Sequence, residues 1–493
     1  MKKLVQAALV LLAVIFAQGQ IPRPSAVSGG KITPTLQRAL TGAPAAKPLH
    51  VWIHLRDRET GDPKALNRAL DETRAALGER VLRRRAKVRS EAGLVDVRDL
   101  PVDPATLGRV ASLAIRVRAV SRWLNAVSVE ARPDQVRALA AIDNVKGLDF
   151  VRSFRRNSPI PVSRGRGPET ASASLRPFPP FRFLYGFGYR QVEQIGVLPL
   201  HQSGLTGAGV TVALFDVGFR HSHETFRTAR LLAQRDFVMG DDDVQRNLAD
   251  PSDYTDDHGT ATWSLLGGYS PGRLIGPAYG ADFILAKTED DRSETPVEED
   301  YWVAALEWAE SLGVDVVSSS LGYTNWYEFP DLDGRTAVIT LAADRAAELG
   351  VVVVNAAGNE RDKAWGHIII PADGFKVIAA GAVDSSGYLA SFSSPGPTAD
   401  GRIKPEVCAM GVWNFVATSE SAGGDSGYTW GSGTSYSTPL IAGVVALLLE
   451  AHPDWTPQDV RDALMSTASR ASIPDNDYGW GIINGPAANL WKR

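Results

Sequence analysis

The stretch that most constrains this chain is Gly433–Pro439, which reads Gly-Thr-Ser-Tyr-Ser-Thr-Pro, with the apolar run that follows it from Leu440. That run is apolar on every side, which is typical of a helix buried in the middle of a large domain. Pro439 falls in the first turn of the predicted helix, where its missing N–H does no harm. Ser435 is therefore delivered to a buried helix N-terminus, where free N–H groups favour a developing negative charge. An ordinary Ser/Thr helix cap is the alternative, so a catalytic role needs partners elsewhere in the chain.

Length and composition indicate a large globular protein. The chain has 493 residues, of which 44% are hydrophobic and 22% charged, with a formal net charge of −4. This length allows two or three domains, and the weakly negative charge gives no reason to expect a nucleic acid partner. The single cysteine, Cys408, excludes a disulfide within the chain, so stability must come from a large core or bound ions.

Residues 1–19 have the layout of a secretory signal peptide. Lys2 and Lys3 precede an apolar run from Leu4 to Ala17, and Ala17 and Gly19 are small enough for cleavage after Gly19. A membrane anchor is the alternative, but the run is too short to span a bilayer comfortably. We therefore predict a secreted protein, extracellular or periplasmic, that has no membrane contact after signal cleavage.

A small module is predicted over residues 48–156, after a Pro-, Ala-, Gly- and Ser-rich linker over residues 20–47. The order of strands and helices suggests a ferredoxin-like α+β unit with an additional helical piece. The expected strands are 51–55, 119–129 and 145–151, and the expected helices are 63–91, 105–117 and one that opens at 132. The run Arg83–Lys87 is basic. A nucleic acid patch is the alternative, but in an exported acidic protein we expect a solvated helix face.

Residues 157–184 are rich in proline, serine, glycine and arginine, and are predicted to be a flexible linker open to proteolysis. From 185 to 493, near-continuous apolar strands alternate with helices. This pattern predicts a doubly wound, mostly parallel α/β sheet with helices on both faces. The strands are expected at 210–215, 283–287, 314–318, 351–355 and 377–381, and the helices at 258–267, 299–311, 337–349 and 437–450.

Three polar residues follow buried strands or open helices of this sheet. Asp216 comes directly after the first strand, His258 opens a helix within Asp-Asp-His-Gly-Thr, and Asn359 lies just past another strand. Each alone has a structural explanation, as a cap, a core histidine or an Asx turn. With Ser435, however, they supply a nucleophile, a base, a carboxylate that orients the base and an oxyanion donor. Those are the groups that acyl transfer needs.

In this order, the residues resemble the subtilisin-like serine proteases (the subtilase family), in which Asp, His and Ser follow one another along the chain. The matching motifs extend over nearly the whole segment from Tyr185 onward. They are Ala213-Leu-Phe-Asp216-Val-Gly, Asp257-His258-Gly-Thr, Ser319-Ser320-Leu321-Gly322, Ala357-Gly358-Asn359-Glu360 and Gly433-Thr-Ser435.

The resemblance implies a secreted serine endopeptidase that hydrolyses peptide bonds through a Ser435 acyl-enzyme and is made as an autoprocessed zymogen. It implies that His258 is the general base and acid, that Asp216 orients it, and that Asn359 and the Ser435 N–H form the oxyanion hole. The implied substrate-binding edge, along which a peptide lies as an added strand, is Ser320, Leu321 and Gly322.

The same resemblance implies the partners and cofactors. Protein or peptide substrates are expected, with residues 48–156 as an inhibitory prodomain, and no cofactor is expected for catalysis. A structural calcium ion at Asp241–Asp243, Asp250 and Asp253 is left open, although a solvated loop is the alternative. The cluster His221–Glu224 lacks a further ligand motif, so no metal site is predicted there.

Departures from the family pattern and the residues of the predicted S1 pocket bear on activity and specificity. Val217 stands where the family usually has Thr or Ser, and Tyr436 and Pro395 also depart from common family residues, but no catalytic group is lost. The rival interpretations are a catalytically dead relative kept as a binding protein, and an esterase or peptide ligase with the same machinery. Bulky Ile369 and Ile370 lie where the family builds a wall of its S1 pocket, which predicts cleavage after small or medium apolar residues.

Overall fold

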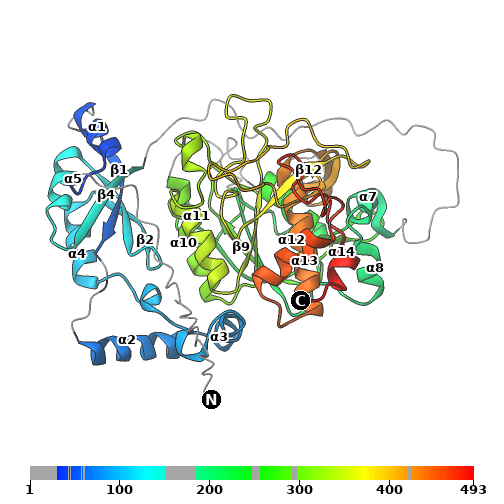
Figure 1. Ribbon diagram of the computed structural model, residues 1–493, viewed down its shortest axis with the longest axis horizontal. Coiled ribbons are helices and arrows are strands. Elements are labelled where there is room, and N and C mark those ends of the chain that lie inside the picture. The colour runs from blue at the N-terminus through cyan, green and yellow to red at the C-terminus, as the bar shows by residue number, and fades with distance from the viewer. Residues whose placement is uncertain are drawn as a thin grey trace, which may run out of the picture.

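The computed structural model describes residues 30–42, 44, 46–56, 58, 62–151, 184–246, 256–290, 297–419 and 424–493. The predicted signal peptide, and the predicted linker up to residue 183, lie outside these residues. The described chain forms two units around two sheets (Figure 1). We call residues 30–151 the N-terminal domain and residues 184–493 the C-terminal domain.

The N-terminal domain contains a four-stranded antiparallel sheet in the order β2-β3-β1-β4. Its strands are β1 (Leu49–Leu55), β2 (Arg116–Ser121), β3 (Ala126–Ala131) and β4 (Val145–Val151). Helices α4 (Pro104–Leu113) and α5 (Pro133–Ala140) contribute buried Val110 and Val136 to one core with Val51 and Val129 of the sheet. The α+β unit expected from the sequence is confirmed.

The linker predicted over residues 20–47 is wrong for part of its length, because helix α1 (Pro34–Gly42) lies within it. Leu36 and Leu40 of this helix are 0% and 4% exposed and join the core of the N-terminal domain. Their spacing of four residues puts both on one helix face. Ile32, just before the helix, pairs with Leu148 of β4. Apolar burial therefore outweighs the turn-rich composition of this segment.

A helical excursion leaves the N-terminal domain between β1 and α4. We call residues 62–101 the arm. The single helix predicted over 63–91 is in fact two helices, α2 (Pro63–Ala76) and α3 (Glu79–Ala86), with Gly78 between them as the N-cap of α3. Two short turns of 3-10 helix follow, η1 (Glu91–Gly93) and η2 (Val97–Asp99). In Figure 1, α2 runs along the lower edge of the molecule and α3 reaches the C-terminal domain.

The C-terminal domain is organised by a seven-stranded parallel sheet in the order β13-β12-β11-β10-β5-β9-β6. All five predicted strands are present, whereas β6 and β13 at the two edges were not predicted. The strands are β5 (Thr211–Asp216), β6 (Arg230–Asp236), β9 (Asp282–Lys287), β10 (Val316–Ser319), β11 (Val352–Ala356), β12 (Ile378–Val383) and β13 (Val407–Met410).

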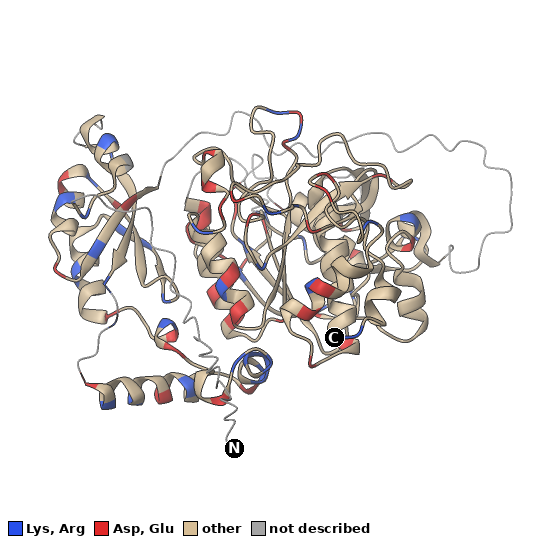
Figure 2. Cartoon of the chain, viewed as in Figure 1, with Lys and Arg blue, Asp and Glu red and all other residues tan. Residues whose placement is uncertain are grey.

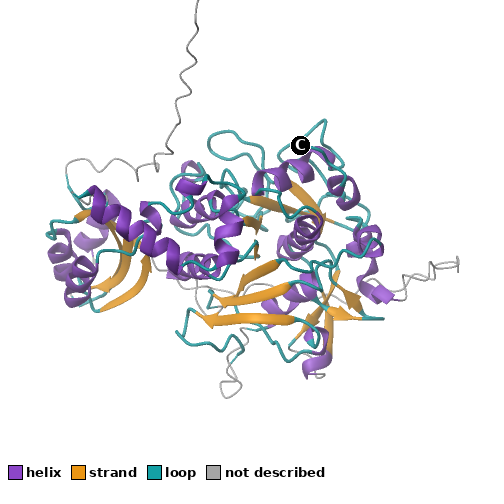
Figure 3. Ribbon diagram, turned by 90° about the horizontal axis from the view of Figure 1, so that it is seen from below, coloured by secondary structure: helices purple, strands orange, loops and turns teal. Residues whose placement is uncertain are grey.

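Helices cover both faces of this sheet (Figure 3), as the sequence predicts. One core packs α9 (Asp257–Gly267) and α12 (Thr434–Ala451) against one face, and a second core packs α10 (Val297–Ser311) and α11 (Val338–Glu348) against the other. Among the described residues, α12 alone is long and apolar enough to cross a membrane, but 89% of it is buried. It is therefore the central core helix that the sequence predicts.

The remaining elements of the C-terminal domain lie around this framework. They are α7 (Tyr189–Glu193), α8 (Val197–Gln202), β7 (Tyr269–Ser270), β8 (Leu274–Ile275), β14 (Asn414–Thr418), β15 (Gly427–Gly431), α13 (Pro457–Thr467), α14 (Gly485–Asn489) and the 3-10 turns η3 (Gly186–Gly188), η4 (Glu224–Phe226), η5 (Phe329–Asp331) and η6 (Gly424–Ser426).

Candidate active site

The sequence-predicted site residues lie at strand ends and helix starts of one sheet. Asp216 is the last residue of β5, His258 is the second residue of α9, and Ser435 is the second residue of α12. Their exposed fractions are 1%, 6% and 8%, respectively. Carboxyl ends of parallel strands meet at one edge, which is where functional groups of such sheets gather.

His258 and Asp216 are joined by a hydrogen bond. Nδ1 of His258 lies 2.7 Å from Oδ1 of Asp216, and the backbone N–H of Val217 donates to the same oxygen at 2.8 Å. The hydroxyl of Thr262 donates to the other oxygen, Oδ2, at 3.0 Å. Because a carboxylate faces Nδ1, that nitrogen carries the proton in the neutral ring and Nε2 is left as the free acceptor.

Thr262 was not among the sequence-predicted residues. It lies four residues after His258 in α9, so the two side chains share one helix face and both reach Asp216. The buried Thr262 hydroxyl therefore holds the second carboxylate oxygen of Asp216. The i, i+4 spacing is the signal that could have found it.

The environment of His258 acts on its pKa in two opposing directions. Burial favours the neutral ring and lowers the pKa, whereas the Asp216 carboxylate, through its charge and its hydrogen bond, favours the imidazolium and raises it. The net effect is a pKa above the ordinary value of 6.5. The pair is therefore arranged to stabilise an imidazolium that forms when His258 accepts a proton.

Ser435 and Ser320 lock the start of α12 to the end of β10. The Ser435 hydroxyl donates to the Ser320 carbonyl at 3.3 Å, and the Ser320 hydroxyl donates to the Ser435 carbonyl at 2.8 Å. This reciprocal pair fixes Ser435 relative to the segment that continues into Leu321 and Gly322. The candidate nucleophile and the candidate substrate-binding edge are thus held together.

The Asn359 carboxamide has a fixed orientation. Its Oδ1 accepts from the backbone N–H of Thr434 at 2.9 Å and from the Thr434 hydroxyl at 3.1 Å. The amide nitrogen therefore points away from Thr434. A Cβ placed on Gly433 would lie 3.6 Å from Nδ2 of Asn359 and 3.7 Å from the backbone nitrogen of Ser435. Nδ2 of Asn359 and the backbone nitrogen of Ser435 therefore both lie within 4 Å of one point beside Gly433.

Ile369 fills the gap between two glycine-containing segments of the site. A Cβ on Gly322 would lie 2.5 Å from Cδ1 of Ile369, and a Cβ on Gly358 would lie 2.5 Å from its Cγ2. The next residue, Ile370, exchanges backbone hydrogen bonds with Tyr323 at 2.9 and 3.2 Å. The Ile369 side chain is therefore wedged between the candidate substrate-binding edge and the segment that carries Asn359.

No group of three or more His, Cys, Asp or Glu suited to a metal ion occurs among the described residues. His223 is buried and lies 2.8 Å through Nε2 from the Gly427 carbonyl, and its Nδ1 accepts from the N–H of Thr225. Both of its ring nitrogens thus have structural partners. Asp241–Asp243 are exposed, and two of the predicted calcium-site residues, Asp250 and Asp253, lie outside the described residues.

Comparison with known families identifies the C-terminal domain. Residues 207–481, more than half of the chain, match the model of the subtilase family, Peptidase S8. The chain belongs to the subtilase family. Residues 50–164 match the Peptidase S8 propeptide domain of Bacteroidota. The N-terminal domain is therefore the propeptide domain of this subtilase, and the chain is a serine endopeptidase by family.

Characterised relatives support the same identification. The subtilase is 34% identical over 300 residues to subtilisin E of Bacillus subtilis (strain 168), a match that covers 60% of this chain and 70% of subtilisin E. It is 30% identical over 313 residues to the serine protease AprX of the same organism, covering 57% of this chain and 66% of AprX. The predicted family and enzyme class are confirmed.

The fold has a counterpart among solved structures. Fervidolysin from Fervidobacterium pennivorans, described as a keratinolytic enzyme related to subtilisin, superposes with a TM-score of 0.60 at 19% sequence identity. The match covers 90% of this chain and 61% of the fervidolysin chain. At this identity the likeness concerns the fold alone, and it confirms the predicted subtilisin-like fold class.

Proposed function

We propose that this subtilase is an exported serine endopeptidase that cleaves protein or peptide substrates through a Ser435 acyl-enzyme, and that it is made as an autoprocessed zymogen. The observation that carries the proposal is the 2.7 Å hydrogen bond from His258 Nδ1 to Asp216, in a site where two N–H donors border one space beside Ser435. A carboxylate-oriented base, a serine at a helix N-terminus and an oxyanion site together are the parts of acyl transfer.

In the proposed reaction, Oγ of Ser435 attacks the substrate carbonyl carbon while Nε2 of His258 takes its proton. The negative charge on the carbonyl oxygen is stabilised by Nδ2 of Asn359 and the Ser435 N–H. His258 then protonates the leaving amine, and a water molecule releases the acid product by the same steps. Asp216 stays ionised throughout and stabilises the imidazolium. No cofactor takes part in these steps.

The substrate is proposed to lie as an extended strand along Ser320, Leu321 and Gly322, recognised mainly through its backbone. The N-terminal domain is proposed to inhibit the enzyme until it is removed. Export is proposed from the layout of residues 1–19 and agrees with the propeptide match. A structural calcium ion at the loop that contains Asp241 stays a prediction.

Labelling with a fluorophosphonate tests the proposal, because this reagent reacts with serines that a neighbouring base activates. We expect one adduct on Ser435, located by peptide mass mapping, together with hydrolysis of unmodified peptides. Absence of labelling in the processed protein would favour the catalytically dead relative. Labelling with ester hydrolysis or ligation, but no peptide hydrolysis, would favour the second rival.

Asn359→Ala is expected to lower kcat by about 10²–10³ with little change in KM, a loss known from subtilisin itself for one oxyanion donor. The donor acts on the charge that develops only in the transition state, so substrate binding is spared. Steady-state kinetics with a chromogenic peptide measure both constants. Asn359→Asp is the matched control, because it keeps the Oδ1 acceptor for the hydrogen bonds from Thr434 but removes the Nδ2 donor. Near-normal turnover in Asn359→Asp would contradict the oxyanion role.

Ile369→Ala is expected to widen substrate choice at the P1 position. In the wild type we expect cleavage after small or medium apolar residues, because Ile369 occupies the space between Gly322 and Gly358. Removing its outer carbons should raise the preference for Phe over Ala at P1 by about tenfold or more. A peptide-library profile measures this, with Ile370→Val as a control for general loosening. A wild-type profile dominated by Lys or Arg, or an unchanged profile in Ile369→Ala, would refute the filled pocket.

A further inference from the structure

The arm of the N-terminal domain touches the C-terminal domain through arginines that the sequence placed on a solvated face. Arg84 and Arg85 are 1% and 0% exposed, so the predicted solvated face is wrong for both residues. Arg83, the preceding residue in α3, is exposed. In Figure 2, basic segments of α3 lie next to acidic segments of the neighbouring helices. The physical reason is that both buried arginines pair with Glu310, more than 200 positions away along the chain, while Arg85 also pairs with Asp99 inside the arm.

The arginines of the arm bind the C-terminal ends of α10 and α11. The last carbonyl groups of a helix have no partner within it and carry its negative partial charge. Arg84 and Arg89 donate to carbonyls at these helix ends at 3.1 to 3.3 Å, and Arg80 and Arg84 donate to two carbonyls just after α10 at 2.8 and 2.7 Å. The accepting carbonyls are those of Glu310, Gly313, Val314, Glu348 and Leu349.

Glycines after both helices allow this close approach. Gly313 and Gly350 follow α10 and α11 with φ of +85° and +89°, the left-handed conformation common after a helix end. A Cβ on Gly313 would lie 2.9 Å from the Arg80 side chain, and a Cβ on Gly350 would lie 2.9 Å from the Arg84 carbonyl oxygen. The arm backbone and side chains therefore lie directly against the two helix ends.

The Glu310 carboxylate is the centre of this contact. It is 0% exposed and forms ion pairs with Arg84 and Arg85 of the arm and with Arg122, which follows β2. Burial alone would raise the pKa of Glu310, but the arginine charges lower it below its ordinary value, so the carboxylate is ionised. Breaking such a buried, hydrogen-bonded charge cluster from one side is costly, because the remaining charge loses its partners.

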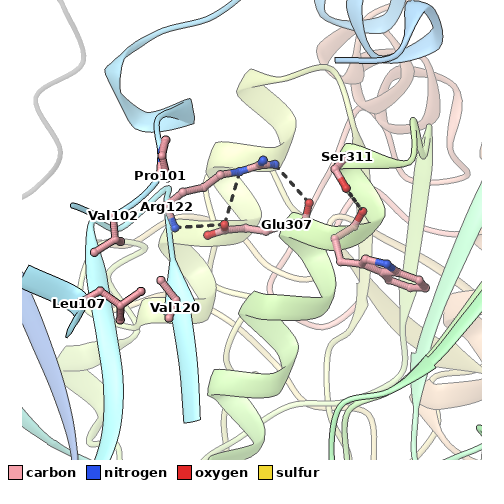
Figure 4. A pocket seen from close by; sticks show the side chains of 8 residues that line it. Pro101, Val102, Leu107, Val120, Arg122, Glu307 and Ser311 are labelled. Atoms are coloured by element: carbon pink, nitrogen blue, oxygen red, sulfur yellow. Dashed lines mark hydrogen bonds and ion pairs between the residues drawn. The ribbon is translucent and has the colours of Figure 1, made fainter. Parts of the chain in front are cut away.

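A second contact, which we call the sheet contact, joins residues of α10 that precede Glu310 to the sheet of the N-terminal domain. Glu307 accepts from the Ser121 hydroxyl at 2.6 Å and from the N–H of Arg122 at 3.2 Å, beside a small crevice shown in Figure 4. Nearer the start of α10, Asp300 accepts from the Ser128 hydroxyl and lies 3.5 Å from Arg118. Asp300 and Glu310 are about 15 Å apart along the helix, at a rise of about 1.5 Å per residue.

We propose that the arm is a second anchor of the N-terminal domain, in addition to the sheet contact, and that it retains this domain on the C-terminal domain after the chain between them is cut. The binding surface is the pair of C-terminal ends of α10 and α11 with Glu310 between them, and the partner that it fits is an arginine-bearing helix. This inference rests on the proposed function only in taking the N-terminal domain to be removable.

The test uses the full chain with Ser435→Ala and a recognition site for a sequence-specific protease placed between residues 157 and 183. After cutting with the added protease, the C-terminal domain is held on a sensor by a C-terminal tag. The dissociation rate of the N-terminal fragment is then measured. Because the cut is made by another enzyme in an inactive chain, the result does not depend on whether this protein hydrolyses peptides.

We expect the unmodified fragment to stay bound after the cut, and the pair Arg84→Met with Arg85→Met to speed its dissociation by about 100-fold or more. Arg83→Met is the matched control, since it makes the same change on the exposed side of α3 and should alter the rate by less than about twofold. If the double variant does not fold, Arg80→Met, with a side chain 33% exposed, is expected to speed dissociation by about tenfold.

Two results would overturn the proposal. One is release of the unmodified fragment as soon as the chain is cut, which would mean that no anchor retains it. The other is a folded arm variant that dissociates at the rate of Arg83→Met, which would mean that the sheet contact alone holds the domain. Arg118→Met, at the sheet contact, gives the size of effect to compare with the arm variants.

Discussion

Replacing Ser435 by alanine is expected to remove peptide hydrolysis almost completely, with a fall in kcat of about 10⁶-fold, the size measured for the same loss in subtilisin itself. The hydroxyl is the group that forms the acyl-enzyme, and the proposed machinery holds no second nucleophile for His258 to activate. Removing His258 should cost nearly as much, because the members of such a triad act as a unit. Initial rates with a chromogenic peptide, on processed protein, measure the effect.

Ser437→Ala is the matched control for this experiment. Ser437 lies on the same helix and is fully buried, and its hydroxyl donates to the Ala409 carbonyl at 3.1 Å. It has no role in the proposed reaction. We expect this variant to keep most of its activity and to lose some stability. Near-normal turnover in Ser435→Ala would contradict the whole assignment, including the roles of Asp216 and Asn359.

The parts of the fold that the sequence predicts are those set by strong local patterns. The helix from Ser437 to Glu450 was predicted from an unbroken apolar run, and α12 spans Thr434–Ala451. Strands β5 and β11 are buried along their whole length and mostly apolar, because both faces of a parallel sheet are covered. Strand β6 was missed because it reads Arg-Leu-Leu-Ala-Gln-Arg-Asp, and its polar residues suit an edge strand with partial exposure.

The parts that the sequence did not predict depend on distant partners. Nothing near Arg84 in the chain shows that it will meet Glu310, since the two are 226 positions apart. For Thr262 the i, i+4 spacing from His258 is only a hint, and its bond to Asp216 appears once β5 lies beside α9. The sequence does not predict helix α1 for a different reason. A few apolar residues in a turn-rich segment are a weak helix signal, and packing on the sheet is what stabilises the helix.

The sequence selects the residues of the candidate site but does not give their geometry. The motifs around Asp216, His258, Asn359 and Ser435 are specific enough to select these residues from the sequence. The wedged position of Ile369 between Gly322 and Gly358 could be expected only loosely, because pocket depth depends on side-chain placement across three segments. The two donors, Nδ2 of Asn359 and the Ser435 N–H, were implied by the resemblance, but their position beside Gly433 comes from the structure.

Self-cleavage of the chain is the second large effect that we expect. The N-terminal domain packs on the C-terminal domain through the arm and the sheet contact, and its last strand, β4, ends at Val151. We propose that Ser435 drives cleavage between about residues 152 and 185, within a segment whose proline-rich composition favours proteolysis. We expect both domains to stay folded after cleavage there, because the described residues of their cores lie within residues 30–151 and 184–493.

The measurement is to express the wild type and Ser435→Ala side by side and to determine the N-terminus of each purified protein. The wild type should begin within residues 152–185, with the released N-terminal domain still bound through the arm and the sheet contact. Ser435→Ala should keep both domains in one chain, and Ser437→Ala should be processed like the wild type. A wild type that is fully active while residues 48–156 remain covalently attached would refute the inhibitory role of the N-terminal domain. The hydrogen bond between His258 and Asp216 would still stand in that case, because it joins α9 to β5 and does not involve the N-terminal domain.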